Sequence, residues 1–478
     1  MRILILLLIP LLGGVSVFFL DGKRRNAAVL TTSVLTALFS LLLVLRGQET
    51  LTLLRLSEQL SLSFALDDLA KLFILLISVI WALEGPYAID YMAHEGRESQ
   101  FFGFFLLTLF SLIALSLAAN LETAYMCFEI MTLVSMPLVL HDAMGESRGA
   151  ALQYLGFNAL GASMTLLGFF LITPYASTLF FAPGGIAFAS GAEMRLLAAY
   201  FLMTLGFSAK AGLMPLQAWL PVAHPVAPAP AHAVLSGLVT KGGVVAVLRV
   251  TLYFFGADFV RGTRAQTVLL VLSVLTIFTG SMLALKEKVL KRRLAYSTVS
   301  NVSYVLFGIF LLQPVALVGA LLQVVFHAFA KCALFLGAGA MIHSTHEKTV
   351  DGIFGCGKRM PLTLAAFAMA SLSLVGIPPF GGFIAKWYLA MGALAAESRL
   401  GTAGVVILLI SAVLTAFYLF PIVTKGYFPG KDFVPKPWEE SSPRMLFAMF
   451  VFAAVALLLG AFPQGLVRAF TAIAEGLL

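Results

Sequence analysis

The sequence predicts an all-α polytopic membrane protein of about 14 transmembrane helices, with two inverted five-helix repeats and with helices 7 and 12 broken. Three observations support this fold class. The 478 residues are 60% hydrophobic and 11% charged, and their mean hydropathy is +0.98. Apolar stretches of about 20 residues, the length of one bilayer crossing, recur along the chain. Two of these stretches are interrupted by glycine and proline.

The expected crossings follow from the apolar stretches and the polar segments between them. In chain order they lie near 3–20, 27–45, 69–91, 101–119, 121–140, 149–172, 196–214, 228–255, 265–285, 294–312, 315–341, 361–396, 402–424 and 445–462. The first stretch has the composition of a signal peptide. No small-residue cleavage site follows residues 13–16, so we expect a retained first helix.

Loop charges predict the orientation of the bundle. The connections after odd-numbered helices hold about 17 Lys and Arg residues, among them Lys23, Lys288 and Lys431, against about 8 in the other connections and tails. The positive-inside rule then places both termini outside, in a prokaryotic-type inner membrane. The net charge of +8 reflects these short loops, so we expect a lipid bilayer and no nucleic acid as partner.

Two interruptions predict the internal organisation. Helix 7 breaks at 211–215, and helix 12 breaks at 376–382. Irregular backbone is not tolerated against lipid, so each break is expected to be buried in protein or to line a wet cavity. The breaks are five helices apart, and a repeat with an odd number of helices has inverted topology. The expected units are helices 1–3 (1–100), the first repeat (101–255), the second repeat (265–424) and helix 14 with its tail (445–478).

Charged residues inside apolar spans are candidates for proton translocation, because a charge at bilayer depth costs about 2.5–3.5 kcal/mol even on a lenient scale. Lys210 lies just before the first break, and Lys386 lies just after the second. Burial disfavours an ammonium, so movement of a neighbouring charge can load or unload its proton. The alternative is that either lysine snorkels from a helix end.

Glu129 lies in the middle of helix 5, where its carboxylate needs a cation or a proton. Lys210 is its expected partner, and a static ion pair is the alternative to a switching one.

Three further candidates lie on helices 8 and 11. Lys241 is deep in helix 8 among small residues that permit close packing or water entry, and we expect a relay role. His327 and Lys331 are spaced i,i+4 on one helix face. Histidine titrates nearest neutrality, so this pair predicts a two-site relay; a packing histidine is the alternative. His224 and His232 flank the proline-rich link between helices 7 and 8, where an access route and an ordinary loop role are both open.

Other charged residues receive simpler interpretations. Arg249 is expected to be an anchoring or structural residue, and Glu122 an interfacial one. Glu84 has no partner that the sequence can assign. The opening of helix 3 is expected to be solvated at the interface through Asp67, Asp68 and Lys71.

The sequence argues against chemistry within this chain. Cys127, Cys332 and Cys356 form no CxxC pair, so a disulfide framework or an iron–sulfur site is not expected. Too few ligands converge for a metal site. Phosphate-binding glycine loops, hydride-cofactor fingerprints and nucleophile elbows are not found. We therefore expect no catalytic residue, cofactor or metal of its own.

Several segments resemble one family. They are 126–132, 210–221 running into 223–228, 327–331 with 334–339, 376–380 and 291–300. Together they are similar to the antiporter-like membrane subunits shared by respiratory complex I, Mrp cation/proton antiporters and energy-converting membrane hydrogenases. Two departures stand out: some relatives carry a histidine where this chain has Gln323, and no long lateral helix follows helix 14.

The resemblance implies a fold of 14 helices with two inverted repeats. It also implies that Glu129 tunes Lys210, that Lys241 connects two half-channels through His327 and Lys331, and that Lys386 serves an entry or exit side.

The expected function is ion translocation, of protons with possible coupling to sodium, by a non-redox subunit of a larger redox-driven complex. Its expected partners are other antiporter-like subunits and peripheral redox subunits, whose iron–sulfur or nickel–iron centres would move the electrons. A subunit of an Mrp-type sodium/proton antiporter is the alternative. A self-sufficient secondary transporter and a purely scaffolding subunit are further alternatives.

Overall fold

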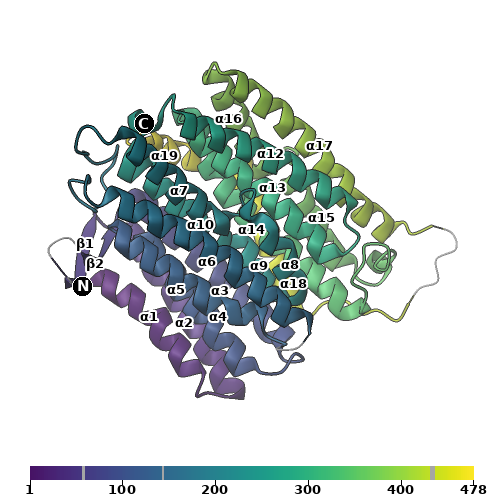
Figure 1. The fold of residues 1–478 in the computed structure, drawn as a ribbon. Helices are drawn as coiled ribbons and strands as arrows, with labels where there is room; N and C mark the ends of the chain where they lie inside the picture. Colours follow the sequence, from purple (N-terminus) through teal and green to yellow (C-terminus); the bar gives the residue numbers. More distant parts are fainter. Residues whose placement is uncertain (56, 58–59, 143–144, 431–435) are drawn as a thin grey trace.

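Apolar helices packed side by side form almost the whole structure (Figure 1). The computed structural model describes residues 1–55, 57, 60–142, 145–430 and 436–478. Within these ranges ten helical segments are long and apolar enough to cross a bilayer, and the helices Arg2–Val17 and Pro361–Val375 are shorter but also apolar. The predicted multi-pass membrane fold is therefore confirmed. The count of 14 crossings, the inverted repeats and the unit boundaries stay predictions, because length and hydropathy do not test them.

The N-terminal part contains an element that the sequence analysis missed. Its helices are α1 (Arg2–Val17), α2 (Gly22–Val44) and α3 (Asp68–Met92), and an antiparallel hairpin of β1 (Glu49–Arg55) and β2 (Ser61–Leu66) joins α2 to α3. The expectation of an all-α fold is wrong at this point. Polar and apolar residues alternate through 50–53 and 61–64, the period of a strand. A search for long apolar runs does not detect so short a pattern.

The next part contains the first helix break. It comprises α4 (Glu98–Leu117), α5 (Leu121–Val139), α6 (Glu146–Ile172), α7 (Glu193–Ala211), the 3-10 turn η1 (Leu216–Trp219) and α8 (Leu220–Val226). Helix α7 ends as predicted, because Gly212 adopts a left-handed conformation with φ of 80°. A continuous helical segment, 229–255, then follows. It alternates α9 (Ala229–Val234), the π-helix η2 (Leu235–Val239), α10 (Thr240–Leu248) and the π-helix η3 (Arg249–Phe255), and the short α11 (Ala257–Val260) comes after it.

The last part contains the second break. Its elements are α12 (Arg264–Lys286), α13 (Leu290–Phe310), α14 (Pro314–Thr345), η4 (Cys356–Lys358), α15 (Pro361–Val375), α16 (Gly381–Ala395), α17 (Arg399–Tyr427), α18 (Pro443–Ala461) and α19 (Gln464–Glu475). The predicted interruption of the twelfth span separates α15 from α16. The expected C-terminal tail is instead partly helical, because α19 packs against α14.

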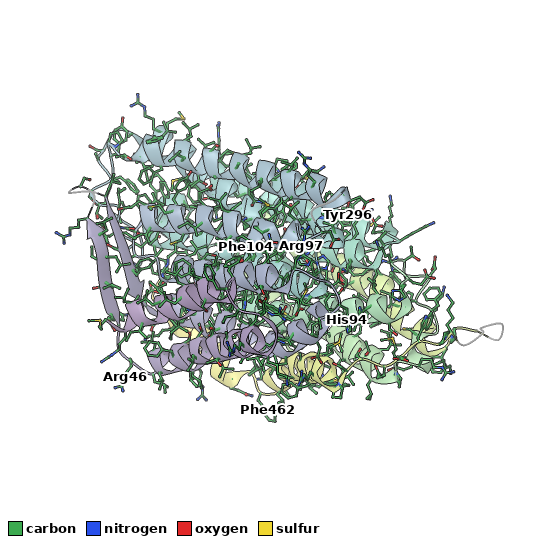
Figure 2. The ribbon with its side chains drawn as sticks, turned by 90° about the horizontal axis from the view of Figure 1, so that it is seen from below. Arg46, His94, Arg97, Phe104, Tyr296 and Phe462 are labelled. Carbon is green, nitrogen blue, oxygen red and sulfur yellow. The ribbon has the colours of Figure 1, made fainter. Side chains whose placement is uncertain are left out.

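The two ends of the bundle differ. Both termini and the hairpin lie at one end in Figure 1. In the turned view of Figure 2, Arg46 lies at that same end, whereas His94 and Arg97 lie toward the other. Which end faces the cytoplasm stays a prediction from loop charges, and Lys431, one of the residues counted for it, lies outside the described residues.

A buried ion pair ties the hairpin end together. The Arg249 side chain is 2% exposed and donates two hydrogen bonds to the carboxylate of Asp67, one of them at 2.9 Å between Nη2 and Oδ1. Asp67 also caps α3 by accepting from the Ala70 N–H at 2.8 Å. Asp67 remains 24% exposed at the start of α3 but is also paired with Arg249, and the structural role expected for Arg249 agrees with this geometry. Burial raises the pKa of Asp67, but the charge of Arg249 outweighs it and holds the pKa below its usual value.

Breaking this pair should destabilise the protein. Asp67→Asn keeps a capping side chain but leaves Arg249 buried without a counter-charge, and we expect a loss of about 3–5 kcal/mol. Because the folded pKa of Asp67 is lowered, the contribution should be complete at neutral pH and should disappear as the pH falls through that lowered value. Thermal unfolding in detergent measures both effects. The double variant Asp67→Leu/Arg249→Met should recover most of the loss; equal melting of Asp67→Asn and wild type would contradict the prediction.

Candidate functional site

Lys210 lies in the last turn of α7, where the helix stops at the first break. Its side chain is fully buried, and its Nζ donates to the Tyr154 hydroxyl of α6 at 2.8 Å. The same ammonium lies 4.4 Å from the ring centroid of Tyr154, and 5.7 and 5.8 Å from those of Phe128 and Trp219. A hydroxyl and three aromatic faces thus replace water around this cation.

Glu129 does not bind Lys210 directly in this conformation. Among the described residues no ion pair joins them, and the buried Oε1 of Glu129 has no hydrogen-bond partner. The expected contact is absent because Lys210 turns toward α6, where Tyr154 also bonds Ser135 at 2.6 Å. The tuning role of Glu129 stays a prediction.

Lys241 and His327 form the contact between α10 and α14. The Nζ of Lys241 lies 2.6 Å from Nδ1 of His327 and donates to the carbonyl oxygen of Ser236 at 3.0 Å. Ser236 belongs to the π-helix η2, a type of irregularity that recurs at functional sites. A small residue one turn before Lys241 allows this approach to α14, since a Cβ on Gly237 would lie 2.6 Å from the Sγ of Cys332. The sequence-predicted connection between Lys241 and His327 therefore has a direct geometric counterpart.

Lys331 reaches different neighbours from His327, although the two are one turn apart. Its Nζ donates to the carbonyl oxygen of Leu294 at 2.8 Å and to the hydroxyl of Ser297, both on α13. It also lies 5.6 Å from the ring centroid of Phe335. His327 and Lys331 thus face α10 and α13 respectively, instead of bonding each other.

Lys386 spans the second break. From α16 its Nζ donates to the carbonyl oxygens of Leu374 at 2.7 Å and of Val375 at 2.6 Å, the last residues of α15. Carbonyl groups at a helix C-terminus have no partner within the helix and carry the negative end of its dipole, so they favour a cation. Lys386 is 8% exposed, which argues against the alternative that it snorkels into water.

These four lysines share one property. Wherever the structure is described, the ammonium groups of Lys210, Lys241, Lys331 and Lys386 are held by hydroxyls, carbonyls, an imidazole or aromatic rings, and none forms an ion pair with a carboxylate. A lysine with neutral partners can lose its proton without stranding an opposite charge. Arg249, whose partner is Asp67, cannot.

His224 and His232 lie together beside this row of lysines. Both are fully buried, their ring centroids are 5.6 Å apart, and within the described parts of the chain none of their ring nitrogens has a hydrogen-bond partner. Phe335 lies 5.2 Å from His224 and 5.7 Å from His232, and it is the same ring that lies under Lys331. The geometry thus brings both histidines next to Lys331, while their role in access stays a prediction.

The described residues contain no group of three or more His, Cys, Asp or Glu that could hold a metal ion. The neutral partners of the lysines, namely Tyr154, Ser236 and Ser297, were not predicted from the sequence. Tyrosine and serine are common in membrane helices, so only their placement beside a lysine marks them. That placement depends on packing between helices far apart in the sequence.

The family model for the transmembrane part of NADH:quinone oxidoreductase and Mrp antiporter subunits matches residues 118–415, more than half of the chain. The chain belongs to this family. The predicted resemblance is confirmed, and the matched range contains all six predicted translocation residues, Glu129, Lys210, Lys241, His327, Lys331 and Lys386.

Three relatives in this family represent three kinds of complex. NADH-quinone oxidoreductase subunit N of Desulforudis audaxviator is 33% identical over 384 residues, 79% of this chain and 74% of the relative. Hydrogenase-4 component B of Escherichia coli is 33% identical over 347 residues, 68% of this chain but only 50% of the relative. A Na(+)/H(+) antiporter subunit of Bacillus subtilis is 25% identical over 462 residues, 95% of this chain and 92% of the relative.

Solved structures show the same fold. A chain of the archaeal membrane-bound sulfane sulfur reductase matches with a TM-score of 0.88 at 21% identity, covering 99% of this chain and 97% of the other. A chain of respiratory complex I from Thermus thermophilus matches with a TM-score of 0.84 at 23% identity and full coverage of both chains. The family fold is thus shared by subunits of multisubunit membrane complexes.

Removing the lysine at the second break should loosen α15. Lys386→Met leaves the carbonyl groups of Leu374 and Val375 without their donor, and we expect a loss of about 1–3 kcal/mol in unfolding free energy. The melting temperature of the purified protein in detergent measures this loss. Lys288→Met, which removes an exposed lysine, is the matched control. A melting temperature of Lys386→Met at or above that of wild type would mean that burying the charge costs more than its hydrogen bonds contribute.

Proposed function

We propose that this chain is a proton-translocating membrane subunit of a multisubunit redox-driven complex, such as a membrane-bound hydrogenase or a complex I-like oxidoreductase. The observation that carries the proposal is the row of buried lysines with neutral partners. Lys210 lies at one break and Lys386 at the other, and Lys241, His327 and Lys331 lie between them in the sequence and on the central helices. Such charges are costly in a membrane protein, and their retention at the helix breaks favours transport over scaffolding.

The neutral partners favour protons as the translocated ion. When an ammonium held by a hydroxyl or carbonyl group gives up its proton, the amine that remains can still accept or donate a hydrogen bond, and no charge is left unpaired. Lys241 and His327 are two titratable bases in contact, so a proton can pass between their nitrogen atoms without a large movement. Sodium would need several converging oxygen ligands, and the oxygen atoms beside each lysine already accept hydrogen bonds from its Nζ.

The partners would supply the driving energy. We expect other antiporter-like membrane subunits beside this chain, together with peripheral redox subunits whose iron–sulfur or nickel–iron centres carry the electrons. The names of the relatives support this assignment, because two of them are components of an NADH-quinone oxidoreductase and of a hydrogenase. Electron transfer elsewhere would then move charges or helices near Lys210 and drive protonation changes along the row.

A second candidate is a subunit of an Mrp-type sodium/proton antiporter. It is favoured by the near full-length match to the Bacillus subtilis antiporter protein, since the match to the hydrogenase component covers only half of that relative. In this case no redox subunit would be present. A self-sufficient transporter is less well supported, because the relatives carry subunit names.

Purification of the tagged chain in mild detergent, with mass spectrometry of its companions, distinguishes these candidates. We expect companion proteins that include subunits with iron–sulfur or nickel–iron centres. Membrane companions without any redox centre would favour the Mrp-type antiporter. Recovery of the chain alone, under conditions that keep other membrane complexes intact, would contradict both assignments.

Removing Lys210 should stop translocation without preventing assembly. In vesicles containing the mutant complex, Lys210→Ala should lower proton uptake to the level of empty vesicles, because the group at the first break can no longer carry a proton. Tyr154→Phe keeps the aromatic face but removes the hydrogen bond, and an intermediate rate is expected. Lys288→Ala is the exposed control and should retain the wild-type rate. Unchanged uptake in a correctly assembled Lys210→Ala complex would sink the assignment of this residue.

A further inference from the structure

Glu84 is a buried acid that the row of lysines does not use. It lies in α3, is 0% exposed, and neither of its carboxylate oxygens has a hydrogen-bond partner in the described parts of the chain. A charged carboxylate in such a position is strongly unfavourable, so Glu84 must carry a proton or gain a partner in another conformation. Its helix precedes the region matched by the family model, which begins at residue 118.

Two tyrosines continue from Glu84 along one face of α3, and a histidine follows in the turn after the helix. Tyr87 and Tyr91 come three and seven residues after Glu84, a spacing that keeps them on one side of the helix, and His94 lies two residues beyond the end of α3 at Met92. The rings of Tyr87 and Tyr91 are stacked with centroids 5.9 Å apart. The row runs from the buried acid toward the end of α3.

The facing helix α14 completes this row. Tyr87 donates its hydroxyl to the carbonyl oxygen of Leu336 at 2.7 Å. About two turns after Leu336 on α14, the ring of His343 lies 5.5 Å from that of Tyr91 and 5.6 Å from that of His94. The seam between α3 and α14 is therefore lined by hydroxyl and imidazole groups over about two turns.

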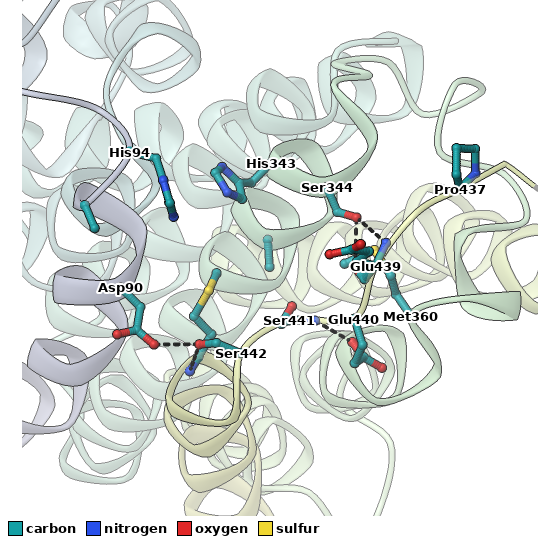
Figure 3. Close-up of a pocket in the computed structure, with 13 residues that line it drawn as sticks. Asp90, His94, His343, Ser344, Met360, Pro437, Glu439, Glu440, Ser441 and Ser442 are labelled. Carbon is teal, nitrogen blue, oxygen red and sulfur yellow. Dashed lines mark hydrogen bonds between the residues drawn. The ribbon is translucent and has the colours of Figure 1, made fainter.

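A cavity of about 500 Å³ opens at the end of the seam where His94 and His343 lie. Figure 3 shows His94 and His343 side by side in its wall. The wall also contains carboxylates: Asp90 is fixed by Ser442 at 2.7 Å and by Arg444 at 3.0 Å, and Glu439 comes from the segment before α18. Imidazole and carboxylate groups in the wall of an open cavity are chemically able to exchange protons with solvent.

The inner end of the seam approaches the central pair. Cys332 of α14 donates to the carbonyl oxygen of Ala233 on α9 at 3.6 Å, and α9 packs against both α3 and α14 just before the segment that carries Lys241. The remaining titratable or charged side chains on the helices packed against α3 are Lys23, Arg24 and Arg25 of α2, Glu98 of α4, His232 of α9, Arg444 of α18, and His327, Lys331 and His343 of α14. Those on α2, α4 and α18 belong to the cavity end, so Glu84 is the innermost acid on this side.

We propose that Glu84 is a proton-binding site, loaded from the cavity at His94 and His343 through Tyr91 and Tyr87. In the loading step a proton from water adds to an imidazole and passes along the two phenols, each of which accepts one proton and releases another. Tyr87 exchanges its hydrogen bond to Leu336 for one to the Glu84 carboxylate, and the proton ends on Glu84 as a neutral acid. That acid is then a donor for the Lys241–His327 pair, and this last transfer rests on the proposed function.

Infrared difference spectroscopy of the assembled complex tests proton binding directly. A titration from acidic to alkaline pH should show the carbonyl-stretch band of a buried protonated acid, and Glu84→Gln should lack that band. Glu193→Gln, which changes an exposed acid at the start of α7, should retain it. A band that survives in Glu84→Gln would overturn the proposal. The result does not depend on transport, so it stays informative even if the complex translocates no protons.

Transport and stability measurements separate proton binding from a packing role. Glu84→Leu replaces an unpartnered polar group by an apolar one, and it should melt at or above the wild-type temperature while proton uptake falls at least several-fold. Glu84→Asp, which keeps the acid, should restore part of the rate. His343→Phe keeps an aromatic ring but removes the titratable imidazole, and it should also slow proton uptake. Wild-type uptake by an assembled Glu84→Leu complex would overturn the proposal.

Discussion

The structure depends on one constraint: buried cations must find neutral hydrogen-bond acceptors where water is excluded. A helix in lipid normally consumes all its carbonyl oxygens internally, so a regular bundle has little to offer an ammonium. Here the irregular places provide the missing acceptors. The end of α15 offers Leu374 and Val375 to Lys386, and the π-helix η2 offers Ser236 to Lys241. Lys386 and Lys241 therefore find backbone acceptors at irregular places, whereas Lys210 uses the hydroxyl of Tyr154 and Lys331 uses groups on α13.

Two classes of buried charge follow from this constraint. At the hairpin end, Arg249 and Asp67 neutralise each other through two hydrogen bonds, which suits a permanent structural tie. In the middle of the bundle the lysines have neutral partners, which suits groups that change their protonation. Glu84 belongs with the second class, since among the described residues no cation pairs with it. The described ion pairs thus separate residues that hold the fold from residues that can exchange protons.

The sequence was sufficient for the features that depend on local pattern. Hydropathy identified the spans, and glycine and proline located both breaks to within a few residues, because Gly212 and Gly376 end their helices in the left-handed conformation. Long-range packing was not accessible in the same way. The predicted Glu129–Lys210 contact is not formed, because the Lys210 ammonium instead binds Tyr154, which lies 56 residues before it in the sequence. The hairpin at 49–66 was missed because a two-residue period is weak beside long apolar runs, and the π-helices have no known signal in hydropathy.

Helix α14 connects the central Lys241–His327 pair to α13 and to the seam with α3. It carries His327, Lys331, Cys332 and His343, and most of its residues are buried within the protein. Its contacts reach Lys241 on α10, Ser297 on α13 and Tyr87 on α3. Because a packed helix moves largely as a unit, a shift of α14 along its axis alters these three contacts together.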